Sequence, residues 1–256
     1  MGAGIHEAAS RGFARAVADY ERGRPGYPPG AVARLAESLA LGPGRTALDL
    51  AAGTGKLTRA LAGTGATLVA VEPVAEMRAA LARACPDVRV LAGTAEAIPL
   101  PAGSVDAVVV GSAFHWFRGG EALAEIHRVL REGGRLGLAW NARDESVPWV
   151  AELTAIMEPH RGTAPRYASG AWREAFAGTR RFSQLAAASF AHTQLLEPEA
   201  VVARVASVSF VAALGDEERA TVLARVRDLL AGDPATRGRE RVELPYRTDV
   251  FWCERR

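Results

Sequence analysis

Residues 46–56 read Thr-Ala-Leu-Asp-Leu-Ala-Ala-Gly-Thr-Gly-Lys. The leucines alternate as they do in a buried strand, and Asp49 stands near the carboxyl end of that strand. Gly53 and Gly55 come next, and glycine lets a backbone turn sharply and lets a ligand approach it closely. The stretch therefore predicts a buried strand, a glycine turn and the start of a helix, in that order.

A second apolar run, Thr67-Leu-Val-Ala-Val-Glu72, ends in an acid twenty-three residues after Asp49. In an open α/β sheet, ligands bind at the carboxyl ends of the strands, and an acid at such an end can bind ribose hydroxyls. The two runs together predict a binding site for a nucleoside-bearing cofactor.

Strands and helices alternate around this unit, and this βα repetition predicts a doubly wound parallel sheet. The run Val105-Asp-Ala-Val-Val-Val110 is nearly all apolar, as expected of a strand that is covered on both faces. Gly133-Gly134 is expected to stop the helix before the fifth strand. The expected strands are 46–50, 67–72, 88–92, 105–110 and 135–141, and the expected helices are 5–20, 30–41, 55–63, 73–84 and 119–131.

The alternation loosens after residue 145, where the pattern is harder to assign. Alternating side chains near the C-terminus, residues 242–253, are typical of a last strand. The other expected elements of this half are a strand at 182–192 and helices at 148–158, 197–207 and 216–231.

Composition excludes several classes of protein. A net charge of +2 over 256 residues gives no strong basic field for nucleic acid. The two cysteines, Cys85 and Cys253, are far apart in the sequence, which indicates free thiols. The sequence contains no Cys/His cluster of the kind that binds a metal. Because the sequence shows no apolar leader and no apolar run of about 18 residues, we expect a cytoplasmic protein that does not enter a membrane.

The glycine turn fits one of three cofactor classes. A Walker A loop needs glycine where Leu50 stands and Ser or Thr where Leu57 stands. The dinucleotide pattern G-x-G-x-x-G fails at Thr58, which replaces the third glycine. S-adenosylmethionine (SAM) has no phosphate and needs a glycine turn beside its amino-acid part and an acid for its ribose, so it remains.

These residues resemble the class I SAM-dependent methyltransferases. Leu48-Asp-Leu-Ala-Ala-Gly-Thr-Gly55 is similar to motif I of that family, with Ala51 in place of the first glycine. Val71-Glu-Pro73 is similar to the acidic second motif. Residues 92–101 resemble the segment that flanks adenine, with Thr94 where an aspartate often stands.

Two further segments extend the resemblance. Residues 125–134, Glu-Ile-His-Arg-Val-Leu-Arg-Glu-Gly-Gly, resemble the helix and turn before strand five. Residues 20–27 (Tyr-Glu-Arg-Gly-Arg-Pro-Gly-Tyr) and 113–117 (Ala-Phe-His-Trp-Phe) resemble the small-molecule branch of type 11 methyltransferases that includes trans-aconitate methyltransferase-like proteins.

The resemblance implies a seven-stranded α/β sheet of order 3-2-1-4-5-7-6, with strand 7 antiparallel and helices on both faces. The strands at 182–192 and near the C-terminus would be strands six and seven in some order. It also implies one Rossmann-like domain over 1–256, made of a cofactor lid with helices (1–45), a SAM-binding core (46–145), a variable acceptor-facing region (146–245) and the last strand (246–256).

The resemblance further implies which residues meet SAM and its product S-adenosylhomocysteine (SAH). Glu72 is expected on the ribose hydroxyls, Tyr20 or Arg24 near the methionine carboxylate, and the Ala95 backbone beside adenine. The expected cofactor-binding residues are Tyr20, Arg24, Asp49, Ala51, Gly53, Gly55, Glu72, Pro73, Met77, Thr94, Ala95 and Gly111. The expected acceptor-binding residues are Tyr27, His115, Trp116, Asn141 and Arg143.

His115 follows the fourth strand and stands between two aromatic residues. It is either a general base that takes a proton from the methyl acceptor or a histidine packed among aromatics that positions the loop. The sequence leaves both interpretations open.

The sequence thus predicts methyl transfer from SAM to a small molecule by direct displacement. One alternative is a SAM-binding protein that does not methylate and uses SAM structurally or in a cyclisation. Another is methylation of a macromolecule, which the near-neutral charge disfavours.

Overall fold

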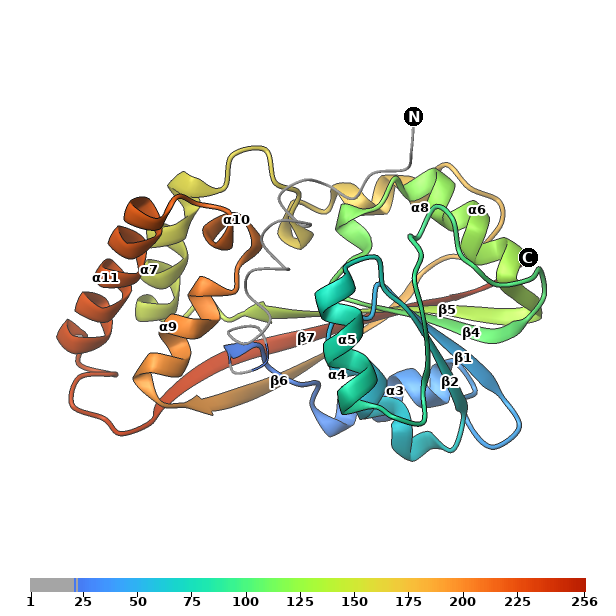
Figure 1. Ribbon diagram of the computed structural model, residues 1–256, viewed down its shortest axis with the longest axis horizontal. Coiled ribbons are helices and arrows are strands. Elements are labelled where there is room, and N and C mark those ends of the chain that lie inside the picture. The colour runs from blue at the N-terminus through green and yellow to red at the C-terminus, as the bar shows by residue number, and fades with distance from the viewer. Residues whose placement is uncertain (1–20, 22) are drawn as a thin grey trace.

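The computed structural model describes residue 21 and residues 23–256, and its strands form one sheet in the order β3-β2-β1-β4-β5-β7-β6 (Figure 1). β1 to β5 run parallel, and β7 runs antiparallel to β5 and to β6. The predicted sheet order and the antiparallel seventh strand are confirmed. The strands are β1 (Thr46–Leu50), β2 (Thr67–Val71), β3 (Arg89–Leu91), β4 (Val105–Gly111), β5 (Leu130–Arg143), β6 (Ala186–Leu196) and β7 (Val242–Glu254).

Helices cover both faces of the sheet. Leu35 of α3 and Leu61 of α4 pack with Ala107 and Val109 on one face, and α5 lies on the same side. On the other face, helix α6 and the short helix α8 pack against the side chains of β1, β4 and β5. These helices are α3 (Pro29–Ser38), α4 (Lys56–Leu61), α5 (Ala75–Ala84), α6 (Gly119–Val129) and α8 (Glu174–Ala177).

A second group of helices gathers around one end of the long strands β6 and β7, at the left of Figure 1. Their buried side chains pack with Leu196, Val242, Leu244 and Tyr246. These helices are α7 (Pro148–Met157), α9 (Pro198–Ala206), α10 (Ser209–Ala212) and α11 (Asp216–Gly232). The expected helices in this half are confirmed to within a few residues.

The main difference from the sequence-based elements concerns the fifth strand. The helix predicted over 119–131 ends at Val129, and β5 begins at Leu130, five residues before its predicted start. Leu130 already pairs with Val105, and the register then shifts before Ala107 pairs with Arg135. Gly133, with φ +70°, therefore turns the chain inside the strand instead of stopping the helix.

The sixth strand is also displaced along the chain. It was predicted over 182–192 and is found at Ala186–Leu196, because its last residue, Leu196, pairs with Val242 at the start of β7. The helix predicted over 5–20 lies outside the described residues. Among the described helices, none is both long and apolar enough to cross a membrane.

Candidate active site

The chain after β1 takes the backbone shape that the glycine motif predicts. Gly53 and Gly55 have φ values of +58° and +85°, and a Cβ on Gly55 would lie 3.0 Å from Leu81 Cγ. Ala51, which stands where the family has glycine, is held at φ +57°. That conformation costs a residue with a side chain about 1 to 2 kcal/mol. The backbone at position 51 thus has the conformation that the family's glycine would adopt, although alanine stands there.

A second strained residue comes just after the neighbouring strand. Ser112 directly follows β4 and has φ +56°, and its N–H donates to Ala139 O at 2.7 Å. β4 is hydrogen-bonded to β1, so Ala51 and Ser112 follow adjacent parallel strands at the same edge of the sheet. Backbone strain of this kind gathers at functional sites, which marks this edge.

Glu72 closes the turn from the end of β2. One carboxylate oxygen, Oε2, accepts the Gly53 N–H at 2.8 Å, and Oε1 accepts the Val74 N–H at 2.9 Å. The side chain is only 5% exposed, and burial raises its pKa while these two N–H groups oppose the rise. Each oxygen keeps a second lone pair, with which it can accept a hydroxyl hydrogen bond.

Asp49 lies beneath the same turn and is 1% exposed. Its Oδ2 accepts the Thr58 hydroxyl at 2.6 Å, and its Oδ1 is buried and meets no hydrogen-bond partner among the described residues. Burial is the main cause that raises the pKa of Asp49 to about 7. The carboxyl group therefore keeps its proton to a much higher pH than an exposed aspartate does.

The residues expected around adenine come from the segments after β2 and β3. Met77 of α5 and Ala95 are buried, and Pro73 is partly exposed. The hydroxyl of Thr94 is buried and meets no partner in the part of the chain that the structure describes. A buried hydroxyl without a partner fits a site whose ligand supplies a hydrogen bond.

The segment before α3 crosses this edge as a strap, which we define as residues 23–27. Asn141 at the end of β5 donates to Gly26 O at 3.0 Å. A Cβ on Gly111, the last residue of β4, would lie 2.6 Å from Tyr27 Oη. Arg24 donates to Ser207 O at 3.2 Å, just after α9. Tyr20, the other lid residue that we predicted, lies outside the described residues.

Glu21, which precedes the strap, contacts the helix that follows the glycine turn. Lys56 Nζ donates to Glu21 O at 3.0 Å, and Arg59 Nη2 lies 3.1 Å from Glu21 Oε2. Lys56, the single lysine of the chain and the first residue of α4, thus ties that helix to the segment before α3.

His115 lies in a single helical turn, Phe114–Trp116, after β4. The indole Nε1 of Trp140 donates to His115 Nδ1 at 3.1 Å, and the ring of Trp116 stands 5.2 Å away. Burial first, and then the positive charges of Arg24 and Arg161, lower the pKa of His115 to about 3. The imidazole is therefore neutral at physiological pH.

Asn141 and Arg143 end β5, as expected, but make different contacts. Asn141 Oδ1 accepts the hydroxyl of Thr248 on β7, which fixes the amide that donates to the strap. Arg143 Nη2 donates to Thr154 Oγ1 of α7 at 3.2 Å, while its Nε is buried. The structure thus brings every predicted site residue that it describes to the carboxyl edge of the sheet or its immediate borders.

Trp140 and Arg204 are among the residues of this region that sequence reasoning missed. Trp140 fixes the orientation of His115, and nothing in the strand pattern singles it out. Arg204 of α9 is only 5% exposed, and the Cβ of a residue at Gly23 would lie 2.4 Å from Arg204 Cα. Its helical spacing from Val201 and Val208 is a signal that could have found it, since a buried helix face seldom carries an arginine.

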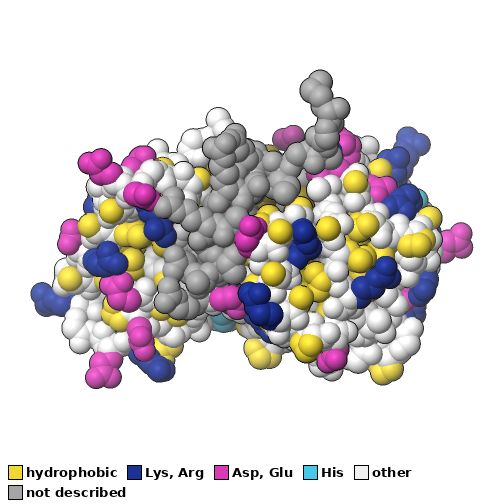
Figure 2. All heavy atoms as spheres, viewed as in Figure 1, with side chains coloured by type: hydrophobic (Ala, Val, Ile, Leu, Met, Phe, Trp, Pro, Cys, Tyr) yellow, Lys and Arg dark blue, Asp and Glu magenta, His cyan; other side chains and the backbone are white. Residues whose placement is uncertain are grey.

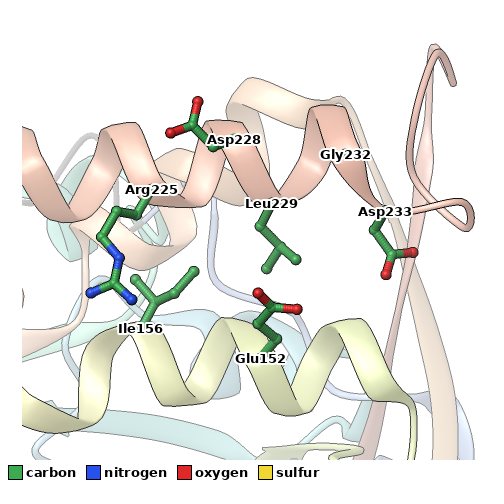
Figure 3. A pocket seen from close by; sticks show the side chains of 7 residues that line it. All are labelled: Glu152, Ile156, Arg225, Asp228, Leu229, Gly232 and Asp233. Atoms are coloured by element: carbon green, nitrogen blue, oxygen red, sulfur yellow. The ribbon is translucent and has the colours of Figure 1, made fainter.

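A groove on another part of the molecule lies between α7 and α11 (Figure 3). Glu152 and Ile156 of α7 point toward Leu229 of α11, while Asp228 points away from the groove. No residue of the glycine turn or of the strap lines this groove. It is therefore separate from the edge described above.

Comparison with known proteins gives the family. A family model described as a methyltransferase domain matches residues 48–138. The chain is 44% identical over 239 residues to the uncharacterized methyltransferase Rv3342 of Mycobacterium tuberculosis, covering 93% of each chain. The chain belongs to the class I SAM-dependent methyltransferases. This methyltransferase is also 36% identical to a methyltransferase-like protein of Schizosaccharomyces pombe, over 95% of each chain.

Solved structures support the same fold. The YcgJ protein of Bacillus subtilis superposes with a TM-score of 0.57 at 18% identity, covering 89% of this methyltransferase and 98% of that chain. The structure of a geranyl diphosphate methyltransferase in complex with SAM superposes with a TM-score of 0.50 at 17% identity, covering 89% and 85%. At these identities the likeness concerns the fold alone.

Proposed function

We propose that this methyltransferase binds SAM across the carboxyl ends of β1, β2 and β4 and transfers its methyl group to a small molecule. The observation that carries the proposal is the hydrogen bond from the Gly53 N–H to Glu72. It joins the glycine turn, which lets a ligand approach the backbone, to the acid that can hold ribose hydroxyls.

The residues present fit this cofactor. Asp49 Oδ1 beneath the turn and Thr94 Oγ1 after β3 are buried polar atoms without a hydrogen-bond partner among the described residues, which fits a bound ligand. Gly53, Gly55 and Ala51 shape the turn, Pro73, Met77 and Ala95 would flank adenine, and Gly111 leaves room at the end of β4. Arg24 of the strap would lie near the methionine carboxylate.

SAM, when bound, would supply a methyl group on a positively charged sulfur, so that forming the bond from acceptor to methyl would break the methyl–sulfur bond and release SAH. The protein then has to align the acceptor with the methyl group and exclude water. The strap, through Tyr27 and Asn141, covers the edge where both would meet. His115 and Trp116 belong to the helical turn after β4 and would contact the acceptor.

The tautomer of His115 bears on its role. Because an indole N–H is only a donor, Nδ1 of His115 has to accept, and the ring hydrogen then resides on Nε2. In this form Nε2 donates a hydrogen bond to the acceptor and does not remove its proton. We therefore propose that His115 orients the acceptor.

Several observations support a small acceptor. On the face seen in Figure 2, basic and acidic side chains are interspersed and form no broad basic surface for nucleic acid. Residues 46–145 would hold SAM, residues 1–45 would cover it, and residues 146–245 would face the acceptor. One relative is named for a small-molecule acceptor. It is a demethylmenaquinone methyltransferase of Beutenbergia cavernae, 38% identical over 115 residues, which cover 44% of this chain and 47% of that one.

Calorimetric titration of the purified protein with SAM, SAH and NAD tests the cofactor half. Binding of SAM and SAH without NAD is expected, and an equal response to NAD would overturn the proposal. Transfer of a labelled methyl group from SAM to a library of small molecules tests the other half. SAM binding without methylation of any small acceptor would favour a non-methylating role or a macromolecular substrate.

A further inference from the structure

Two arginines at the border of the site, the half-buried Arg143 and the buried Arg204, each have one buried nitrogen without a partner. Arg143 Nε and Arg204 Nη1 are buried N–H groups, and neither meets a hydrogen-bond partner among the residues that the structure describes. Arg143 ends β5, whereas Arg204 comes from α9, 61 residues later.

Tyr246 of β7 brings the two arginines to one place. It pairs directly with Arg143 across the antiparallel strands, so both side chains stand on the same face of the sheet. Its hydroxyl lies 3.3 Å from Arg204 Nε, which donates to it. Tyr246 itself is 1% exposed, so this meeting point is shielded from bulk water.

Other guanidinium groups face the same region. Burial first, and then repulsion from Arg204, lower the pKa of Arg143 to about 10, and Arg161 adds to this repulsion. Arg161 and Arg24 also act on His115. The surroundings of Arg143 therefore collect positive charge from β5, α9 and the segment after α7.

No acid among the described residues forms an ion pair with Arg143 or Arg204, although the charge of Glu145 partly opposes the fall in the pKa of Arg143. Glu145 accepts the Thr154 hydroxyl at 2.9 Å, so Thr154 stands between it and Arg143. Glu158 pairs with Arg161 at 2.7 Å and with Arg166 at 3.2 Å. Two like charges held together with unmet N–H groups are costly unless an anion joins them.

We propose that Arg143 and Arg204 bind an anionic group of the methyl acceptor, a carboxylate or a phosphate, and so select acidic acceptors. Guanidinium groups match both anions because their N–H groups form a planar fork. This inference rests on the proposed methyl transfer. It places the anchoring anion beside Tyr246, on the acceptor side of His115, and away from the glycine turn that would hold the amino-acid part of SAM.

The first experiment is a calorimetric titration of the SAH-saturated protein with matched probes. These are succinate with succinamide, 4-hydroxybenzoate with 4-hydroxybenzamide, and inorganic pyrophosphate. At least one anion is expected to bind about tenfold or more tightly than its neutral partner, or, for pyrophosphate, than succinamide. Preference for carboxylate or for pyrophosphate identifies the anion, and equal binding of charged and neutral probes overturns the inference.

Variants then assign the effect to the two side chains. Arg143→Met and Arg204→Met are each expected to weaken the binding of the preferred anion about tenfold or more, with SAH affinity changed by less than about twofold. Arg143→Lys keeps the charge, loses the fork and gives an intermediate loss. Arg237→Met, which removes an exposed arginine in the loop before β7, is the matched control and leaves anion binding unchanged.

The outcomes separate this inference from the proposed function. Failure of the unmodified protein to bind SAH contradicts the proposed function itself. Intact SAH binding with anion affinity unchanged in Arg143→Met contradicts only the anion site. Loss of SAH affinity in Arg143→Met assigns the arginine to the methionine carboxylate and also overturns the inference. If Arg204→Met does not fold, the two Arg143 variants carry the test.

Discussion

The indole Nε1 of Trp140 lies 3.1 Å from His115 Nδ1, and this contact sets the hydrogen on the imidazole. We predict that ¹⁵N NMR of the protein finds His115 with Nε2 protonated and Nδ1 unprotonated. Because the pKa of His115 is lowered to about 3, its two nitrogen signals are expected to stay constant between pH 5 and pH 8. In Trp140→Phe the donor is lost, and the pKa is expected to rise. A titration of His115 near pH 6.5 in the unmodified protein would contradict the assignment.

Turnover separates a donor at this position from a base. With an acceptor in hand, His115→Ala is expected to lower kcat about tenfold to a hundredfold, the effect of one lost hydrogen bond to a charged group. His115→Gln retains an N–H near the position of Nε2 and is expected to recover most of that loss. A general base would instead lose about 10² to 10⁴ in both variants, so equal and large losses would restore the base role.

The raised pKa of Asp49 is expected to make the free energy of unfolding depend on pH. Its pKa is raised to about 7 in the folded protein from 3.8, so the folded state binds this proton more tightly than the unfolded state. The stabilisation is complete below pH 3.8 and is lost as the pH rises through 7. Relative to Asp49→Asn, the unmodified protein is expected to lose about 2 to 3 kcal/mol between pH 5 and pH 8. Urea unfolding of both proteins at the two pH values measures this difference, and parallel curves would show that the carboxyl group ionises normally.

The glycine turn and its acid could be predicted from the sequence because both are local. Residues 46–56 carry the strand, the turn and the helix start within one short run, and Glu72 is the only acid at the end of the second strand. Parallel pairing of β1 with β2 then leaves little freedom in where these groups meet. The sheet order came from the family resemblance, since nothing local in the sequence sets the place of β7 between β5 and β6.

Glu72 itself gives a prediction on cofactor affinity. Glu72→Ala removes the acceptor for ribose hydroxyls and leaves the Gly53 N–H without its partner. We expect SAH binding to weaken by about 1.5 to 3 kcal/mol, the range for hydrogen bonds to a charged group. Glu76→Ala, which changes an exposed acid in the first turn of α5, is the matched control. Calorimetry with unchanged affinity in Glu72→Ala, and with the fold verified by circular dichroism, would remove Glu72 from the site.

The acceptor side could be predicted far less well, because its contacts join segments distant in sequence. Arg143 and Arg204 come together beside Tyr246, which the sequence places 42 residues beyond Arg204. Trp140 and His115 meet because β4 and β5 are adjacent and both end at this edge. Periodicity marks Arg204 as buried but does not say what it faces. The position of the strap could not be predicted for the same reason, since Asn141 and Gly26, which hold it to β5, are 115 residues apart in the sequence.

Tyr27 and Gly111 allow a direct test of whether the strap controls the cofactor edge. A Cβ at position 111 would lie 2.6 Å from Tyr27 Oη but no closer than 3.3 Å to Leu57, so the tyrosine hydroxyl is the main obstacle. Gly111→Ala is expected to displace the strap and to cost about 1 to 3 kcal/mol of stability, the usual range for overpacking. SAH affinity should fall in parallel, because Gly111 ends β4 beside the glycine turn.

The double variant makes that test specific. Tyr27→Phe removes the hydroxyl that meets the new methyl group, so Gly111→Ala is expected to cost clearly less in the Tyr27→Phe background than in the unmodified protein. Because Tyr27→Phe alone has its own effect, all four proteins are compared in a double-mutant cycle of unfolding free energies and SAH affinities. A coupling energy near zero would mean that the strap does not lie against β4 in solution. A clear coupling in stability without one in SAH affinity would show that the strap is held at this edge but does not shape the cofactor site.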